Sequence, residues 1–153
     1  MIRLIIEKLT ADLELIFNAA KTAYMASINE ENQPDNKYDT QALEASYVAQ
    51  GQANRAQEIR RSIETYKHLE FLESGGTIRL TSLVTLDAGN GAIKRVFIGP
   101  VAGGLRIATE DDDIMVITPA SPLGKALIGK AIYDTVDVKS GDALTEYQVI
   151  GIV

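Results

Sequence analysis

The sequence predicts an α+β fold, in which an antiparallel helical hairpin over residues 1–74 precedes a small β-rich domain over residues 75–153. Two observations predict this division. Apolar residues recur every three or four positions in the first half, which is typical of amphipathic helices. After Ser74-Gly75-Gly76 the period changes to short apolar runs separated by turn residues, which is typical of strands.

The first predicted helix runs from Ile2 to about Ile28, because no glycine or proline interrupts its apolar stripe. Pro34 then disfavours helix at the residue before it. A second helix begins near Asp39 or Thr40, either of which is a suitable N-cap, and it ends before the two glycines. Neither helix is stable alone, so we expect the two apolar stripes to pack against each other in an antiparallel pair.

The pattern of residues 75–153 predicts an antiparallel sheet with one short helix. A hairpin turn is expected at Asp87–Gly91. The short helix is capped by Ser121, has Pro122 at its first position and ends at Gly129. The expected strands are Thr77–Leu86, Ala92–Ile98, Leu105–Ala108, Ile114–Thr118, Thr135–Val138 and Glu146–Ile152.

The composition excludes several classes of function. The chain has 153 residues, no cysteine and one histidine, so disulfides, thiolate catalysis and a His-rich zinc site are excluded. No apolar run approaches the roughly 18 residues of a membrane span, and a reducing cytoplasm is the default location. The net charge of −6 argues against independent binding of duplex DNA, which needs a basic surface.

The excess negative charge lies between the two predicted helices. Residues 29–44, which we call the tip, contain five acidic residues and one basic residue, a net charge of −4. The rest of residues 1–73 is balanced, so the tip is suited to a cation or a basic partner, and a solvated loop is the alternative. The charged residues of the tip are Glu30, Glu31, Asp35, Lys37, Asp39 and Glu44.

The segment Ile117–Lys130, which reads Ile-Thr-Pro-Ala-Ser-Pro-Leu-Gly-Lys-Ala-Leu-Ile-Gly-Lys, stands before Asp134–Val136 and Tyr147–Ile150. Together these segments resemble the C-terminal domain of the bacterial GreA/GreB transcription elongation factors. The first half also fits, since that family has an N-terminal antiparallel coiled coil with an acidic tip. The resemblance implies an FKBP-like fold for residues 75–153.

The resemblance also implies an accessory factor of RNA polymerase that is not itself an enzyme. The globular domain would dock on the polymerase, and the coiled coil would enter the secondary channel, modulate elongation and stimulate transcript cleavage by the polymerase. The candidate docking residues are Pro119, Ser121, Pro122, Leu123 and Gly124, for which a structural cap is an equally good interpretation.

Three basic residues of the second predicted helix, Arg55, Arg60 and Arg61, are candidates for contact with the 3′ end of the nascent RNA. A solvated helix face is the alternative. The acidic run Glu110–Asp113 is interpreted as a solvated turn, because its spacing does not fit a calcium-binding loop.

The cleavage factors of this family use an Asp and a Glu at the tip to help hold a second magnesium ion. Mg²⁺ prefers oxygen ligands, and a two-metal site stabilises both the attacking and the leaving oxygen. Asp39 and Asp35 are the candidate catalytic residues and ligands of a Mg²⁺ shared with the polymerase, and no intrinsic cofactor is expected. An N-cap is the alternative role of Asp39.

The tip departs from the family pattern Asp-x-x-Glu-Asn, because Asn36, Asp39 and Thr40 occupy the three named positions. A non-cleaving regulator or inhibitor that occupies the channel is therefore the alternative function. A third interpretation is an adaptor that uses the helical rod to grip unrelated proteins.

Overall fold

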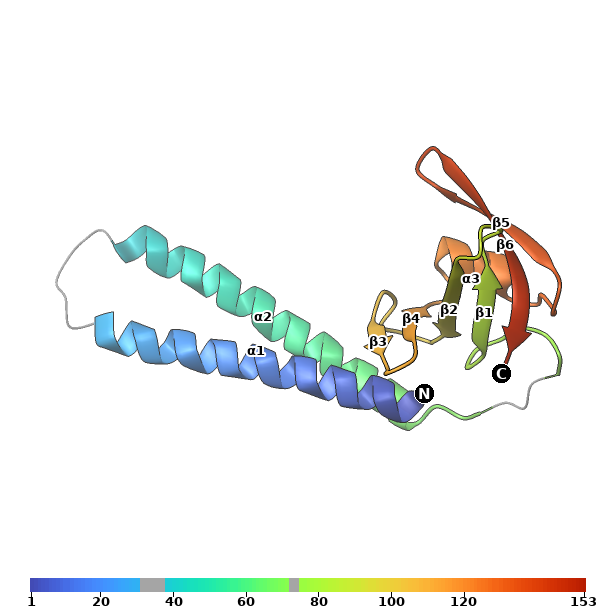
Figure 1. Cartoon of the computed structure of the whole chain (residues 1–153). Helices are drawn as coiled ribbons and strands as arrows, with labels where there is room; N and C mark the ends of the chain where they lie inside the picture. The colour runs from blue at the N-terminus through green and yellow to red at the C-terminus, as the bar shows by residue number, and fades with distance from the viewer. Residues whose placement is uncertain (31–37, 72–74) are drawn as a thin grey trace. The chain divides into compact units, whose positions relative to one another are not determined.

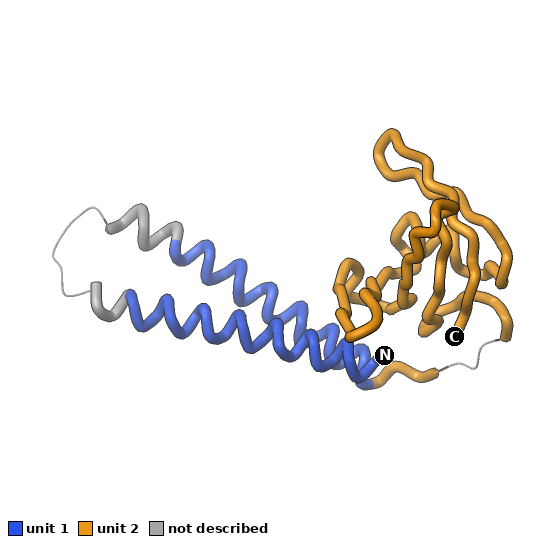
Figure 2. Tube along the Cα trace, in the orientation of Figure 1, with its two compact units in different colours: residues 1–67 blue, residues 68–153 orange. Residues whose placement is uncertain are grey.

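The computed structural model describes residues 1–30, 38–71 and 75–153, and side chains at 1–26, 45–71 and 75–153 (Figure 1). The chain divides into two compact units, Met1–Lys67 and His68–Val153 (Figure 2). The first unit is helical, and the second contains a six-stranded sheet with one short helix, so the α+β fold class is confirmed. The boundary expected from the sequence, between residues 74 and 75, lies slightly later in the chain than the observed boundary after Lys67.

The first unit is a hairpin of two long helices, α1 (Ile2–Glu30) and α2 (Tyr38–Lys67). α1 begins where the sequence predicts and continues slightly further, whereas α2 ends before the predicted stop at the two glycines. Gly51 lies inside α2, and no other atom lies within 4 Å of the position that a Cβ would occupy there. None of the described helices is long and apolar enough to cross a membrane.

The two helices bury their apolar stripes in the half of the hairpin that holds residues 1–14 and 55–67, which we call the base half. Ile5, Leu9, Ile59, Ile63 and Tyr66 are all buried there. Burial of each of the four aliphatic side chains contributes about 1.5–3 kcal/mol relative to exposure. The base half therefore holds the hydrophobic core of the hairpin.

The rest of the described hairpin, residues 15–26 and 45–54, is its outer half, where the helices diverge (Figure 1). The apolar stripe is not covered there: Phe17 is 46% exposed, Tyr24 66% and Val48 61%. The expectation that each helix buries its whole stripe against the other is therefore wrong for this half. An open groove of about 530 Å³, which we call the outer groove, is lined by Ile16, Phe17, Ala20, Ala23, Tyr24, Ala45, Val48, Ala49, Gln52, Ala53 and Ala56.

The second unit is one sheet with strand order β3-β4-β2-β1-β6-β5 and one helix, α3 (Pro122–Leu127). All neighbouring strands are antiparallel except β2 and β4, which are parallel. The sequence pattern does not anticipate this parallel pair. The strands are β1 (Leu83–Asp87), β2 (Ile93–Ile98), β3 (Arg106–Ala108), β4 (Asp113–Ile117), β5 (Thr135–Ser140) and β6 (Ala143–Ile152).

The first strand is shorter than the segment Thr77–Leu86 that the sequence predicts. Thr81 has a φ of 72°, which interrupts the extended backbone before β1 begins at Leu83. Thr77 forms only an isolated bridge with Ala131. The residues before β1 therefore pack as an irregular segment rather than as part of the strand.

The core of the second unit joins α3 to one face of the sheet. Alternate residues of β1 and β2 contribute to it, as expected when successive side chains point to opposite faces. Two residues of α3 complete it from the other side. The buried members are Ile78, Val84, Leu86, Val96, Ile98, Ile117, Leu123, Leu127, Val136 and Val149.

Candidate functional site

The candidate metal ligands belong to the tip of the hairpin, where the description of side chains stops. Asp35 lies outside the described residues. The backbone of Asp39 lies in the first turn of α2, and its side chain is outside the described part. Within the described part of the chain, no group of three or more His, Asp or Glu side chains is placed to hold a metal ion. The metal-binding role of Asp35 and Asp39 therefore stays a prediction.

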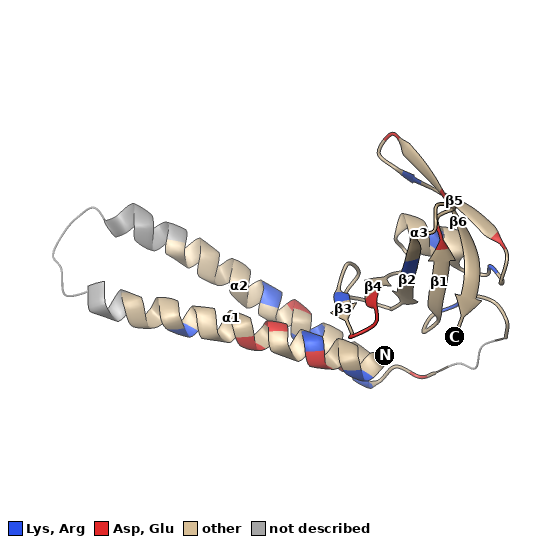
Figure 3. Ribbon diagram, in the orientation of Figure 1, with Lys and Arg blue, Asp and Glu red and all other residues tan. Residues whose placement is uncertain are grey.

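The charges of the hairpin are distributed unevenly along its length (Figure 3). The outer half carries one charged side chain, Lys21, and the other basic residues of the helices lie in the base half. A rise of 1.5 Å per residue places Lys21 about 14 Å from Glu30, and Arg55 about 16 Å from Glu44, along the helix axes. These separations exceed the Debye length of about 8–10 Å at physiological salt. The helical shaft therefore does little to neutralise the acidic tip.

The three arginines proposed to contact RNA all lie exposed in the base half of α2. Arg55 Nη1 donates to Glu58 Oε2 at 2.9 Å, an i,i+3 pair on the same helix. The guanidinium of Arg60 lies over the ring of Phe17 on α1. Two of the three arginines, Arg55 and Arg60, thus have partners within the hairpin, and contact of Arg55, Arg60 or Arg61 with RNA stays a prediction.

The segment expected to dock on a partner forms the start of α3. Ser121 Oγ accepts a hydrogen bond from the Gly124 N–H at 3.0 Å and donates one to the Thr118 carbonyl at 2.7 Å. Pro122 follows in the first helical turn, where its missing N–H costs nothing. The predicted cap is confirmed, and it holds the Pro119–Gly124 turn in one conformation.

The five candidate docking residues are brought together in this turn, but they differ in what they offer a partner. Pro119 and Pro122 are exposed. Leu123 is buried in the core, and Ser121 is half-buried in the cap. A Cβ at Gly124 would lie 2.0 Å from the Thr118 carbonyl oxygen, so only glycine fits there. The two prolines are therefore the members of this set that present their side chains to a partner.

Two arginines partly neutralise the acidic run Glu110–Asp113. The sequence pattern did not indicate these pairs. Arg95 Nη1, on β2, bonds Asp112 Oδ2, and both side chains are about 30% exposed. Arg106 Nη1, on β3, donates to Asp113 Oδ2 at 3.2 Å in a more exposed pair. The turn is thus tied to the sheet and is not simply solvated as predicted.

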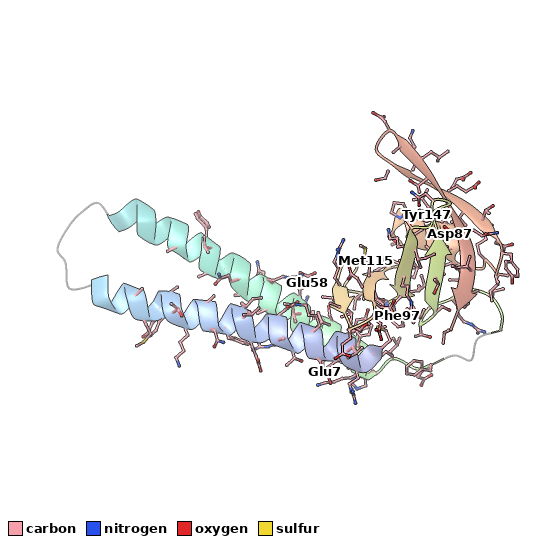
Figure 4. The ribbon with its side chains drawn as sticks, in the orientation of Figure 1. Glu7, Glu58, Asp87, Phe97, Met115 and Tyr147 are labelled. Atoms are coloured by element: carbon pink, nitrogen blue, oxygen red, sulfur yellow. The ribbon has the colours of Figure 1, made fainter. Side chains whose placement is uncertain are left out.

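A polar pocket of about 360 Å³ lies in the second unit beside the turn after β1. Asp87 lines this pocket, and Figure 4 shows Asp87 near Tyr147 on β6. The Nζ atom of Lys94 lies over the ring of Tyr147 in a cation–π contact, 5.6 Å from the ring centroid. Sequence reasoning missed this contact, because only the pairing of β1 with both β2 and β6 brings the two residues together.

No protein-family model matches the chain, and no curated protein matches it. The solved structures that are similar to the chain include the following three. The transcription factor Gfh1 is 28% identical, with 96% of this chain and 92% of that chain covered and a TM-score of 0.42. The GreA factor homolog 1 (Gfh1) protein of Thermus thermophilus is 26% identical, with 97% and 94% covered and a TM-score of 0.42. A GreA/GreB transcription elongation factor from Nitrosomonas europaea is 15% identical, with 61% and 78% covered and a TM-score of 0.38.

Proposed function

We propose that this chain is an accessory factor of bacterial RNA polymerase that brings the acidic tip of its hairpin to the active centre through the secondary channel. The observation that carries the proposal is the hairpin itself. α1 has 29 residues and α2 has 30, and they fold as a unit distinct from the sheet. At 1.5 Å per residue each helix is about 43–45 Å long, which is enough to carry a small charged tip into a deep channel.

The charge layout supports the same proposal. The tip has a net charge of −4, and the outer half of the hairpin carries only Lys21. Carboxylates that the helical shaft leaves largely unneutralised are the hard oxygen ligands that a Mg²⁺ ion in a polymerase site accepts. When bound, such an ion would supply Lewis-acid stabilisation, and the role of the tip would be to supply one or two of its ligands.

Docking is assigned to the second unit. The cap formed by Ser121 and Gly124 holds Pro119 and Pro122 exposed at the start of α3. Exposed prolines lose little conformational entropy on binding, so they suit a docking surface. This turn also belongs to the segment Ile117–Lys130, which carries the sequence resemblance to the GreA/GreB family.

A second candidate function is a regulator that occupies the channel without stimulating cleavage. The observation that favours it is the sequence of the tip, where Asn36 stands at the position of the Asp of the family pattern. An amide oxygen is a weaker magnesium ligand than a carboxylate. This second function keeps the docking and the insertion and removes only the metal chemistry.

The test is transcript cleavage in a stalled, backtracked elongation complex with purified full-length protein. The variants are Asp39→Asn and Asp35→Asn, with Glu14→Gln as the control that removes one carboxylate from the same hairpin outside the tip. Cleavage by wild type and by Glu14→Gln, with loss in Asp39→Asn, supports the cleavage factor.

A binding assay with core polymerase tests the non-cleaving regulator and the docking role of the α3 turn. Binding without cleavage, together with competition against an authentic cleavage factor, supports the non-cleaving regulator. Absence of binding to core polymerase overturns both functions. A Pro119→Ser, Pro122→Ala double variant that binds as well as wild type would remove the docking role of the α3 turn.

A further inference from the structure

The outer groove is an apolar surface that the hairpin leaves uncovered. Phe17, Tyr24 and Val48 line it and are between 46% and 66% exposed. Contiguous exposed apolar surface of this kind marks an interaction site in soluble proteins. A pair of amphipathic helices whose stripes stay open is completed by further helices, as in a four-helix bundle.

The chemistry of the groove selects an apolar protein partner. The outer half carries one charged side chain, Lys21, so it lacks the basic surface that a nucleic acid requires. With one cation in each copy, two outer halves meet with little mutual repulsion. Alanines on both helices, such as Ala20 and Ala49, allow a second pair of helices to approach closely.

The charges at the two ends of the outer half select a second copy in one orientation. Toward the tip, the helices carry Glu30, Asp39 and Glu44. On the other side, the base half contains six basic and five acidic residues, a net charge of +1, and its basic excess lies on α2, where Arg55–Lys67 has a net charge of +2. An antiparallel pair of hairpins places the acidic end of each copy beside the basic stretch of the other, whereas a parallel pair places acidic ends together.

We propose that the outer groove is the interface of a homodimer, in which two hairpins pair antiparallel through their outer halves and form a four-helix bundle. The interface is isologous, because the same apolar patch of both copies is buried around a two-fold axis. On the proposed polymerase function, this dimer is a storage form, since it covers the hairpin that must enter the channel.

The first experiment measures the molar mass of the full-length protein by sedimentation over a range of concentrations. Val48→Glu places a charge in the groove, and Asn54→Glu adds the same charge to an exposed position of α2 that does not line it. The proposal predicts a concentration-dependent dimer whose Kd rises at least about tenfold in Val48→Glu, because the interface would bury an unpaired charge. In Asn54→Glu the Kd should change less than about threefold. Equal helical circular dichroism establishes that both variants fold.

The second experiment measures the orientation of the dimer. The chain has no cysteine, so a single Asn18→Cys or Arg3→Cys variant accepts one spin label per copy. An antiparallel pair centred on the outer halves brings the Asn18 labels within the width of the bundle and separates the Arg3 labels by about 50 Å along the axis. Two short distances would indicate a parallel pair and overturn the proposal.

A wild-type protein that remains monomeric at every concentration also overturns the proposal, and the groove is then closed by α1 and α2 themselves or covered by a different protein. This result leaves the polymerase function untouched if the protein binds core polymerase. Conversely, a dimer that never binds polymerase overturns the proposed function and leaves the dimer standing.

Discussion

The guanidinium of Arg60 on α2 lies over the ring of Phe17 on α1, with 5.0 Å between Cζ and the ring centroid. Phe17 also lines the outer groove, so this contact ties the two helices together where the buried base half gives way to the open outer half. A cation–π pair at an exposed site contributes about 0.5–1 kcal/mol. The contact therefore stabilises the hairpin at the point where packing alone becomes insufficient.

A double-mutant cycle of Arg60→Gln and Phe17→Leu should give a coupling free energy of about 0.5–1 kcal/mol. The measurement is urea unfolding of the full chain followed by helical circular dichroism, at a concentration where the protein has one oligomeric state. Arg61→Gln is the matched control, because it removes a neighbouring exposed arginine. A coupling as small for Arg60 with Phe17 as for Arg61 with Phe17 would contradict the role of the stacked pair.

Gly124→Ala should lower the free energy of unfolding of the second unit by about 3 kcal/mol, the sum of overpacking and a weakened cap. The physical reason is that the new Cβ would lie 2.0 Å from the Thr118 carbonyl oxygen and 2.9 Å from Ser121 Oγ. Gly129→Ala is the control, since its φ of +82° is strained for alanine but nothing lies within 4 Å. It should cost only about 1 kcal/mol. Denaturant unfolding measures both variants. An equal loss of unfolding free energy in the two would show that the Ser121 cap shifts to accommodate the new methyl group.

Asp112→Asn should destabilise the second unit by about 1 kcal/mol, whereas Asp113→Asn should cost less than about 0.5 kcal/mol. Both substitutions remove one carboxylate charge from the same turn. The difference arises because the Arg95–Asp112 pair is the less exposed of the two, and water screens the Arg106–Asp113 pair more. Thermal unfolding of the two variants at low and high salt tests this order. A reversed order would show that burial does not control the strength of these pairs.

Stability at high pH should report on Tyr66. Burial raises the pKa of Tyr66 from 10.0 to about 12. The unfolded chain loses the phenolic proton first, so the free energy of unfolding is unaffected well below pH 10 and falls by about 2 kcal/mol as the pH rises to 12. Tyr66→Phe should remove this part of the pH dependence. Tyrosinate absorbance should show one late ionisation that is absent in Tyr66→Phe, and a wild-type titration without a late step would contradict the assignment.

Local signals predicted the elements whose cause is local. The uninterrupted stripe of α1, the Ser121 cap and the turn at Asp87–Gly91 depend on residues within a few positions, and each was confirmed. The predicted start of β1 was wrong, because the apolar pattern of the sequence does not reveal the φ of 72° at Thr81. The sequence predicted the candidate site as the carboxylates Asp35 and Asp39. The structure does not describe their side chains, so their geometry stays untested.

The sequence by itself determined a helical hairpin with an acidic tip, a β-rich second unit and a short helix capped by Ser121. These follow from periodicity, capping and charge, which act over a few residues. Only the tertiary structure decided which half of the apolar stripe is buried, which arginines pair with Phe17 and Asp112, and that β2 and β4 run parallel. The reason is that such contacts join residues distant in the chain, and their geometry depends on how whole helices and strands pack.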